Sequence, residues 1–298
     1  MVILGLTSLL GIFIIFKTTV NVQSFLEVIS QLDMRYFWLA FATIPPTIIL
    51  NAARWYYVLR AAGFSIPFKR ILVIATGSLP FIVIPGRLGD FIRSYPLRNE
   101  VPINRTIATI ILEKIIDVCS LLVYASIGLF FLGYYLGSAA TLLIAVAAIP
   151  GLIIFKKLKI ARPTKNKIIE KIYDAAEILD RVHERKGLLG MSALCSIMNM
   201  GLSMLEFYWL MLAVHASLPI TVIFAFLPFS LFVGLIPLTL AGTGIREAAM
   251  IYFFKFYALP GELLSAGIFY TLQGYWIAAI LGLPFLYFFF KTSTSQKQ

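Results

Sequence analysis

The feature that most constrains the fold of this chain is a succession of apolar stretches, each long enough to cross a lipid bilayer as a helix. A membrane-spanning helix needs roughly 20 mainly apolar residues. Charged residues make up 13% of the chain, against about a quarter in soluble domains, which excludes a water-soluble fold. We predict six spanning helices among the 298 residues, at 2–20, 36–59, 105–133, 138–155, 187–214 and 262–290.

Two further apolar stretches, 71–97 and 220–257, are broken near their middles by proline and glycine and then by charged side chains. Proline removes a backbone donor and glycine weakens a helix interior, so neither stretch suits one continuous helix. We predict that each is a re-entrant helical hairpin. Irregular backbone at membrane depth is tolerated only inside protein or beside a water-filled cavity, so both breaks are expected to be shielded from lipid. The predicted fold is an all-α integral membrane protein of six spanning helices and two re-entrant hairpins.

The basic residues are concentrated in one loop, which orients the chain in the membrane. The net charge is +11, and ten of the 25 lysines and arginines lie between Lys156 and Lys186. This is typical of a cytoplasmic loop, so we place both termini on the cytoplasmic side of a multi-pass cell-membrane protein. Apolar residues recur at helical spacing in 165–186, which predicts a cytoplasmic amphipathic helix. Nucleic acid is not expected as a partner, because basic residues are scarce elsewhere outside loops.

The two halves of the chain resemble each other, which indicates an internal repeat. The sequences WYYVL at 55–59 and SIP at 65–67 match FYWLM and SLP at a constant offset of 152 residues. We therefore describe one membrane domain, 1–298, with repeats at about 36–155 and about 187–290. An odd number of predicted crossings separates equivalent helices, so the two copies are inverted in the membrane. Inverted repeats with broken helices are common in secondary transporters, whose substrate site lies at the repeat interface.

Ten ionisable residues lie inside the apolar stretches, five basic and five acidic. A charge near the bilayer centre costs roughly 2.5–3.5 kcal/mol on insertion scales, so these groups are expected to pair with one another or to face a wet cavity. Glu113 and Asp117 are four residues apart and share one face of their helix. The ten residues are Arg54, Arg87, Asp90, Arg93, Glu113, Lys114, Asp117, Glu206, Arg246 and Glu247.

Two interpretations of this charged set stay open. In the structural interpretation, Arg93 and Arg246 neutralise nearby carboxylates and hold the hairpins in place. In the functional interpretation, at least Arg87 and Arg246 face an anionic ligand. Arg54 and Glu206 occupy nearly equivalent positions in the two repeats, and for them we predict a structural ion pair.

Glycine pairs adjoin the arginines at both breaks. Gly86 and Gly89 in the first stretch, and Gly242 and Gly244 in the second, lie where a new helix would begin. Free backbone N–H groups and the positive dipole end make such a helix start an anion site. An adjoining arginine can bind a phosphate with two hydrogen bonds, so these glycines join the candidate site.

No metal site, disulfide or cofactor is predicted. Cys119 and Cys195 lie in separate apolar stretches, and His183 and His215 stand singly, so none of them forms a ligand cluster. The sequence contains no ATP-binding motif, so any pumping would draw on an ion gradient or a lipid gradient.

Three motifs concentrate these features: PGRLGDFIRSYPLR at 85–98, EKIID at 113–117 and AGTGIREA at 241–248. With their spacing, the chain resembles the transmembrane, flippase-like domain of lysylphosphatidylglycerol synthases and their stand-alone membrane relatives from about residue 36 to 290. It departs from that family at Asp90, where glutamate is frequent, and at 240–243, where a Pro-Gly-Gly-Leu-Gly run is altered. The resemblance implies movement of a phospholipid or polyprenyl-phosphate lipid between leaflets. The synthases add a soluble aminoacyl-transfer domain that is not found here, so lipid aminoacylation is not expected.

We therefore predict a non-enzymatic protein that binds an anionic membrane lipid and moves it across the bilayer. Arginines would receive the phosphate, and carboxylates would orient the arginines or bind a proton or a cationic head group. Two alternatives stay open: a secondary transporter for a small solute or ion, and a membrane-embedded lipid-linked transferase with Asp117 or Glu113 as a base. The predicted substrate-binding residues are Arg87, Gly89, Asp90, Arg93, Glu113, Asp117, Gly242, Gly244, Arg246 and Glu247.

Overall fold

The computed structural model describes residues 22–157, 185–236 and 239–294, and these residues form helices joined by short turns. The predicted helix at 2–20, and the amphipathic helix at 165–186 up to residue 184, lie outside the described residues. The α-helices are α2 (Val22–Ser30), α3 (Met34–Phe41), α4 (Ile44–Ala61), α5 (Phe68–Gly77), α6 (Ile103–Phe131), α7 (Tyr135–Lys157), α9 (Lys186–Ala213), α10 (Ile220–Val233), α11 (Ile245–Phe254), α12 (Pro260–Thr271), α13 (Ala278–Gly282) and α14 (Leu286–Thr294). The other helical segments are η1 (Leu79–Val83), η2 (Pro85–Leu97), η4 (Leu240–Gly242), η5 (Leu272–Ile277) and η6 (Leu283–Phe285).

The long helices have the length and composition of membrane spans. Among the described residues, three helical segments are long and apolar enough to cross a bilayer: Met34–Ala61, Lys186–Ala213 and Pro260–Lys291. Tyr135–Ala148 and Ile220–Val233 are shorter apolar helices. α6 has the length of a span but carries charged side chains near its middle. These helices confirm the prediction of an all-α, multi-pass membrane protein.

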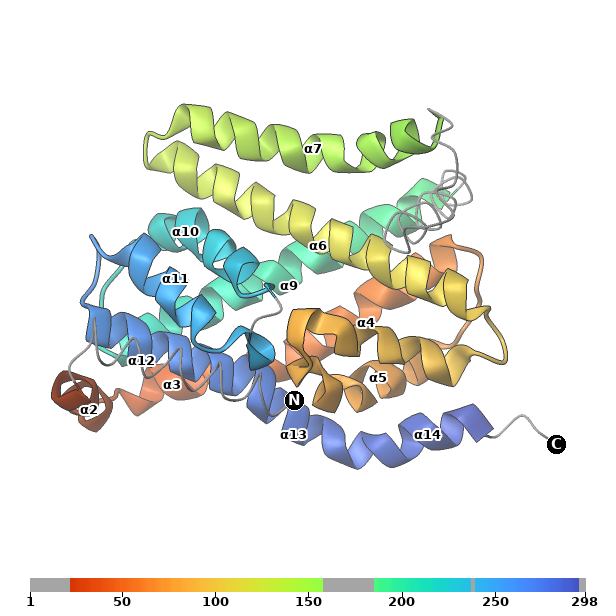
Figure 1. Ribbon diagram of the computed structural model, residues 1–298, viewed down its shortest axis with the longest axis horizontal. Coiled ribbons are helices and arrows are strands. Elements are labelled where there is room, and N and C mark those ends of the chain that lie inside the picture. Colours follow the sequence, from red (N-terminus) through yellow and green to blue (C-terminus); the bar gives the residue numbers. More distant parts are fainter. Residues whose placement is uncertain (1–21, 158–184, 237–238, 295–298) are drawn as a thin grey trace.

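Two long helices, α6 and α9, extend across the molecule and connect two groups of shorter helices (Figure 1). α9 packs along α4, and α6 packs along α7, α10 and α9. One group contains α10, α11 and α12, and the other contains α5 and α14 (Figure 1). The core of the first group includes Phe207 and Phe254, and the core near α5 includes Trp55 and Leu97.

Both interrupted stretches consist of short helical pieces, and the interruptions fall at the expected proline and glycine residues. In the first, α5 is followed by η1 and η2, and in the second, α10 is followed by η4 and α11. Pro67 and Pro219, which are 152 residues apart, directly precede α5 and α10. Gly242 and Gly244 have φ angles of 75° and 91°, a backbone conformation that glycine adopts at no steric cost.

Helices α6 and α10 approach each other backbone to backbone at Gly128. A Cβ atom on Gly128 would lie 2.1 Å from the backbone nitrogen of Ala225, far inside van der Waals contact. A Cβ atom on Gly190 of α9, by contrast, would meet nothing within 4 Å. Small residues that let helices approach closely are characteristic of packing inside membranes.

The C-terminal helix changes its hydrogen-bonding pattern part-way along. Between α12 and α13, the six residues of η5 form a π-helical turn. α12 packs against α9 and α11, whereas α13 packs against η1 and α14 packs against α5 and η2. The two ends of this helix therefore belong to different helix groups (Figure 1).

Candidate functional site

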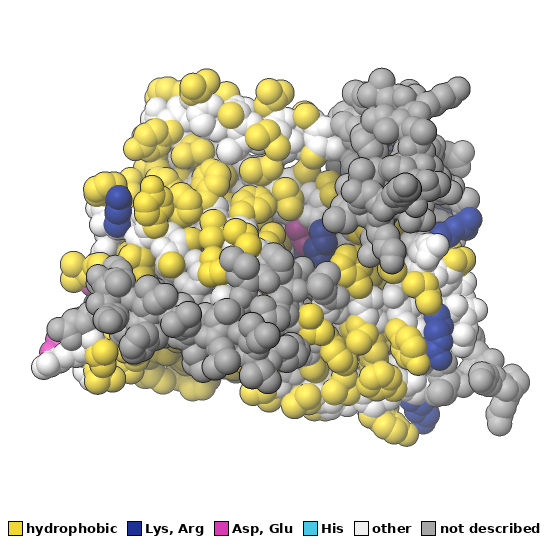
Figure 2. Space-filling view, in the orientation of Figure 1, with side chains coloured by type: hydrophobic (Ala, Val, Ile, Leu, Met, Phe, Trp, Pro, Cys, Tyr) yellow, Lys and Arg dark blue, Asp and Glu magenta, His cyan; other side chains and the backbone are white. Residues whose placement is uncertain are grey.

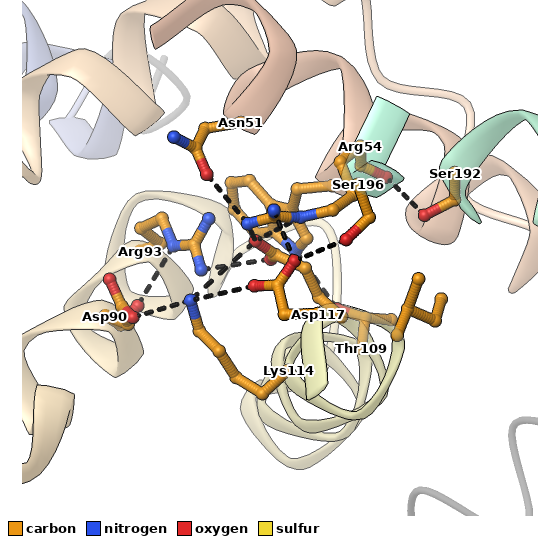
Figure 3. Close-up of polar contacts among 12 residues, drawn as sticks. Asn51, Arg54, Asp90, Arg93, Thr109, Lys114, Asp117, Ser192 and Ser196 are labelled. Atoms are coloured by element: carbon orange, nitrogen blue, oxygen red, sulfur yellow. Dashed lines mark hydrogen bonds and ion pairs between the residues drawn. The ribbon is translucent and has the colours of Figure 1, made fainter. Parts of the chain in front are cut away.

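Arg54 of α4 is the centre of a buried ion-pair network (Figure 3). Its guanidinium nitrogens lie 2.5 Å from Oε1 of Glu113 and 2.5 Å from Oδ1 of Asp117, two carboxylates on one face of α6. The same guanidinium donates a hydrogen bond of 2.8 Å to Oδ1 of Asn51. Arg54 is 1% exposed and Glu113 is fully buried, so this ion pair is removed from water.

The short helix η2 supplies a second arginine to the network. Nη2 of Arg93 lies 3.0 Å from Oε2 of Glu113, the carboxylate oxygen that Arg54 does not contact. The Arg93 guanidinium lies over the Trp55 ring, 4.8 Å from its centroid, and its Nε donates to the backbone carbonyl of Asp90. Glu113 therefore links α4, α6 and η2.

Lys114 is the basic member of the network that reaches furthest toward solvent, with a side chain that is 28% exposed. Its ammonium lies 2.8 Å from Oδ2 of Asp90 and 3.9 Å from Oδ2 of Asp117. With this pair included, three basic side chains face three carboxylates in the network. This charge balance offsets the free-energy cost of placing ionised groups among apolar helices.

A separate polar network lies at the second break, around Glu247 of α11. Its carboxylate accepts hydrogen bonds from the backbone N–H of Gly244 and from the Thr271 hydroxyl. Arg246 is buried, donates a hydrogen bond of 2.5 Å to the Thr271 hydroxyl, and lies 4.4 Å from the centroid of the Tyr275 ring. The second break is thereby tied to the C-terminal helix.

A cavity of about 340 Å³ lies between the two halves of the chain. The first half contributes charged side chains of the network, including Asp90, Arg93 and Lys114. The second half contributes Glu206 of α9 and Tyr270 of α12. Figure 2 shows a basic and an acidic side chain side by side within a largely hydrophobic face, so charged groups reach the surface on this face of the molecule.

Comparison with known proteins places this architecture in a family. The family model described as the lysylphosphatidylglycerol synthase TM region matches residues 2–282. The chain belongs to this family. It is also similar to a UPF0104 membrane protein of Methanocaldococcus jannaschii, with 25% identity over an alignment 297 positions long that covers 88% of this chain and 87% of that protein. The resemblance inferred from the three motifs is confirmed.

In this lysylphosphatidylglycerol synthase TM-region protein, eight of the ten residues predicted to bind substrate fall into two groups. Four of them line the cavity together: Asp90, Arg93, Glu113 and Asp117. Four others form the second break and are not among the residues that line the cavity: Gly242, Gly244, Arg246 and Glu247. Arg87 belongs to η2, but its side chain lies outside the described part of the chain.

The glycines of the breaks are explained by close backbone contacts. A Cβ atom on Gly89 would lie 1.7 Å from the carbonyl oxygen of Phe81, and one on Gly242 would lie 2.5 Å from the carbonyl oxygen of Gly234. The N–H of Gly244, which the sequence suggested as a free anion donor, instead donates to the Glu247 side chain in a capping box. The expectation of a free donor at Gly244 is therefore wrong, because the chain supplies its own carboxylate.

The predicted ion pair between Arg54 and Glu206 is not formed. The backbone carbonyl of Arg54 accepts a hydrogen bond from Ser192 of α9, which fixes the register between α4 and α9. Glu206 follows Ser192 by 14 residues, so it lies about 21 Å further along the helix axis. Arg54 pairs instead with the two carboxylates of α6.

Uncharged polar residues of both networks were missed in the sequence. Ser196 of α9 donates a hydrogen bond of 2.7 Å to Oδ1 of Asp117, and Asn51 and Thr271 accept hydrogen bonds from Arg54 and Arg246. A signal for them exists, because Ser192 and Ser196 are four residues apart and Asn51 is three residues before Arg54. Such spacings place polar groups on one face of an apolar helix.

Proposed function

We propose that this membrane protein binds the phosphate-bearing head group of a membrane lipid and moves it between the two leaflets. The observation that carries the proposal is the cavity between the halves, with charged walls inside an otherwise apolar bundle. A charged head group needs such a path, because an ionised group in hydrocarbon is costly. The family match supports a role connected with membrane lipids. Binding and movement require no chemical step, so we do not propose an enzyme.

The size and lining of the cavity favour a lipid head group as its occupant. A volume of about 340 Å³ is at the low end of small-molecule sites, which suits a phosphate head group without its acyl chains. The cavity is also lined by Leu79 and Ile82 of η1 and by Leu231 and Leu235 at the end of α10. These apolar side chains come from the two broken stretches, and acyl chains would lie against such surfaces while the head group enters the cavity.

Arg93 and Lys114 are the basic side chains that we assign to the lipid phosphate, because both line the cavity. A guanidinium offers a planar pair of donors and an ammonium offers a point charge, and both bind phosphate. Arg87 keeps the phosphate-binding role proposed from its motif. Arg246 donates to Thr271 and lies beside Glu247, so we assign to it the stabilisation of the second break.

We further propose six spanning helices and two re-entrant hairpins, in inverted repeats at about 36–155 and about 187–290, in the cell membrane with both termini cytoplasmic. α4 and α9, the equivalent helices of the two repeats, pack along each other. Each repeat contains a broken stretch that follows a proline at an equivalent position. Both repeats contribute to the walls of the same cavity, as expected for a transport site at a repeat interface.

Single cysteines at positions 136 and 186 are expected to be labelled from opposite sides of the membrane. Leu136 is 86% exposed near the start of α7, on the proposed outer side, and Lys186 begins α9 on the cytoplasmic side. In a background without Cys119 and Cys195, an impermeant thiol reagent on intact cells should modify position 136 alone. Permeabilised cells, in which both positions should react, are the control. Labelling at position 186 in intact cells would contradict the proposed orientation.

A Lys114→Gln variant is expected to move anionic lipid about tenfold or more slowly than wild type. A charge-assisted contact contributes roughly 1.5–3 kcal/mol, and 1.4 kcal/mol corresponds to a factor of ten. The measurement is head-group translocation in proteoliposomes, with fluorescent phosphatidylglycerol or a fluorescent polyprenyl phosphate quenched from outside.

Lys255→Gln is the matched control for this experiment, because Lys255 is exposed at the end of α11 and is not among the residues that line the cavity. It should retain the wild-type rate. Both variants must unfold at the wild-type temperature before rates are compared. An unchanged rate for Lys114→Gln would show that the phosphate assignment is wrong. If wild type moves neither lipid, a secondary transporter of small solutes becomes the better hypothesis.

A further inference from the structure

Glu206 of α9 lies in the cavity wall without the partners that the other carboxylates of the wall possess. It is 6% exposed, and its Oε1 is buried with no hydrogen-bond partner among the described residues. Asp90, Glu113 and Asp117 each pair with a lysine or an arginine. None of the ion pairs observed in the described part of the chain includes Glu206.

The position of Glu206 in the repeat makes this lack of partners informative. Arg54 occupies the nearly equivalent position in the first repeat, and two carboxylates of α6 compensate its charge. An ionised carboxylate that is buried without an ion-pair partner is unfavourable, because nothing in contact with it replaces its lost hydration. Glu206 therefore needs a ligand that neutralises it.

A proton fits this site better than a metal cation does. A hard cation takes several oxygen ligands, whereas a proton needs only one carboxylate oxygen. Two hydroxyls of the second half that line the cavity with Glu206, on Ser203 and Tyr270, lie 2.8 Å apart and are hydrogen-bonded to each other. The Arg246 guanidinium lies 5.6 Å from the centroid of the Tyr270 ring, and its charge repels a divalent metal cation more strongly than a single proton.

The elements that pack near Glu206 differ in the charged and titratable groups that they carry. α10 carries no ionisable side chain, and on α3 Arg35 is exposed and paired with Asp33. On α4, Arg54 is held by the carboxylates of α6. The remaining groups are Asp90 and Arg93 of η2, Glu113, Lys114 and Asp117 of α6, Tyr270 of α12, Tyr275 of η5 and Arg246 of α11.

We propose that Glu206 binds a proton and couples its movement to the movement of an anionic lipid. This inference rests on the proposed function and specifies what drives it. Two basic and four acidic side chains line the cavity, so protonation of Glu206 to the neutral carboxylic acid removes one excess negative charge. An anionic head group then binds more tightly, and by linkage a bound lipid strengthens proton binding to the same degree.

Joint binding predicts that a pH gradient drives transport. One proton and one monoanionic lipid cross the membrane together as a neutral pair. At equilibrium, each pH unit across the membrane then supports about a tenfold accumulation of lipid, because one pH unit and a tenfold concentration ratio are equal in free energy.

The proton site is tested first without transport. In infrared difference spectra of the purified protein in detergent, raising the pH should remove a carboxylic-acid carbonyl band. The isosteric Glu206→Gln variant should lack this band. Glu247→Gln is the matched control and should retain it, because Glu247 is equally buried but accepts hydrogen bonds from Gly244 and Thr271.

A second measurement uses wild type alone and so does not depend on the folding of a variant. Carbodiimides react with protonated carboxyl groups in apolar surroundings. We expect mass spectrometry to locate the adduct at Glu206, with a yield that falls as the pH is raised. An unchanged infrared band in Glu206→Gln, together with no adduct at Glu206, would overturn the proton site. If Na⁺ stabilises wild type but not Glu206→Gln, and no carbonyl band is seen, the site binds sodium. This outcome would also overturn the proposal.

Coupling is tested in proteoliposomes that contain fluorescent phosphatidylglycerol. Lipid accumulation by wild type should follow an imposed pH gradient, and Glu206→Gln should lose this response. If wild type moves lipid but ignores the gradient, the coupling is wrong while the proposed function stands. If the carbonyl band is present and no lipid moves, the proposed function fails and the coupling fails with it, although the proton site itself is confirmed.

Discussion

An Arg54→Met variant is expected to lose about 3–5 kcal/mol of stability, because removal of one partner from a buried ion pair leaves uncompensated charge. Methionine keeps much of the side-chain volume, so the loss reports charge more than packing. Two carboxylates would be affected at once, since Arg54 contacts both Glu113 and Asp117. The measurement is the midpoint of thermal unfolding in detergent, which should fall markedly.

Arg60→Met is the matched control for this prediction. Arg60 is on the same helix but exposed, and its contact with the Tyr56 hydroxyl is at the surface, so the midpoint should change little. Adding Glu113→Gln to Arg54→Met should recover part of the loss, because one of the unpaired charges is then removed. Strict additivity of the two single losses would show that Arg54 and Glu113 are not coupled.

A Gly128→Ala variant is expected to lose about 3 kcal/mol or more, at the upper end of overpacking costs. The added Cβ would meet the backbone of Ala225 at 2.1 Å and that of Phe224 at 2.6 Å. A backbone cannot change rotamer to avoid the methyl group, so α6 and α10 must separate along their contact. This cost outweighs the gain of up to about 1 kcal/mol that alanine gives over glycine inside a helix.

Gly190→Ala is the matched control, because it is the same substitution in another long helix with nothing within 4 Å of the new methyl group. Its thermal midpoint should stay unchanged or rise. Opposite signs for the two variants would confirm the close contact between α6 and α10. A midpoint for Gly128→Ala at or above that of wild type would contradict it.

The positions of the helices could be predicted because apolar length alone marks them. The helix predicted at 187–214 is observed as Lys186–Ala213, and the helix predicted at 105–133 is observed as Ile103–Phe131. The breaks were predictable for a related reason, because clustered proline and glycine weaken the interior of an apolar helix. The shared face of Glu113 and Asp117 follows from a spacing of four residues, which the structure retains.

Contacts between helices could not be predicted from the same information. A helix that is apolar on all sides has no periodic pattern to indicate which face meets a neighbour. The predicted repeat made Arg54 and Glu206 equivalent in sequence, but α4 packs on α9 with Arg54 beside Ser192, which is 14 residues before Glu206. Gly128 shows the same limit, since its importance depends on the backbone of Ala225, which is distant in the sequence.

The π-helical turn of η5 sets an angular offset between the two ends of the C-terminal helix. Each α-helical residue advances the side-chain direction by about 100°, and a π turn accommodates one residue more than an α turn. Every side chain of α13 is therefore rotated by roughly that angle relative to an uninterrupted continuation of α12. If this turn converts to α-helix, α13 must rotate about its own axis against η1 while α12 stays fixed against α9. Because Tyr270 and Tyr275 lie on either side of the start of this turn and both line the cavity, the rotation would alter the shape of the cavity without bending the helix.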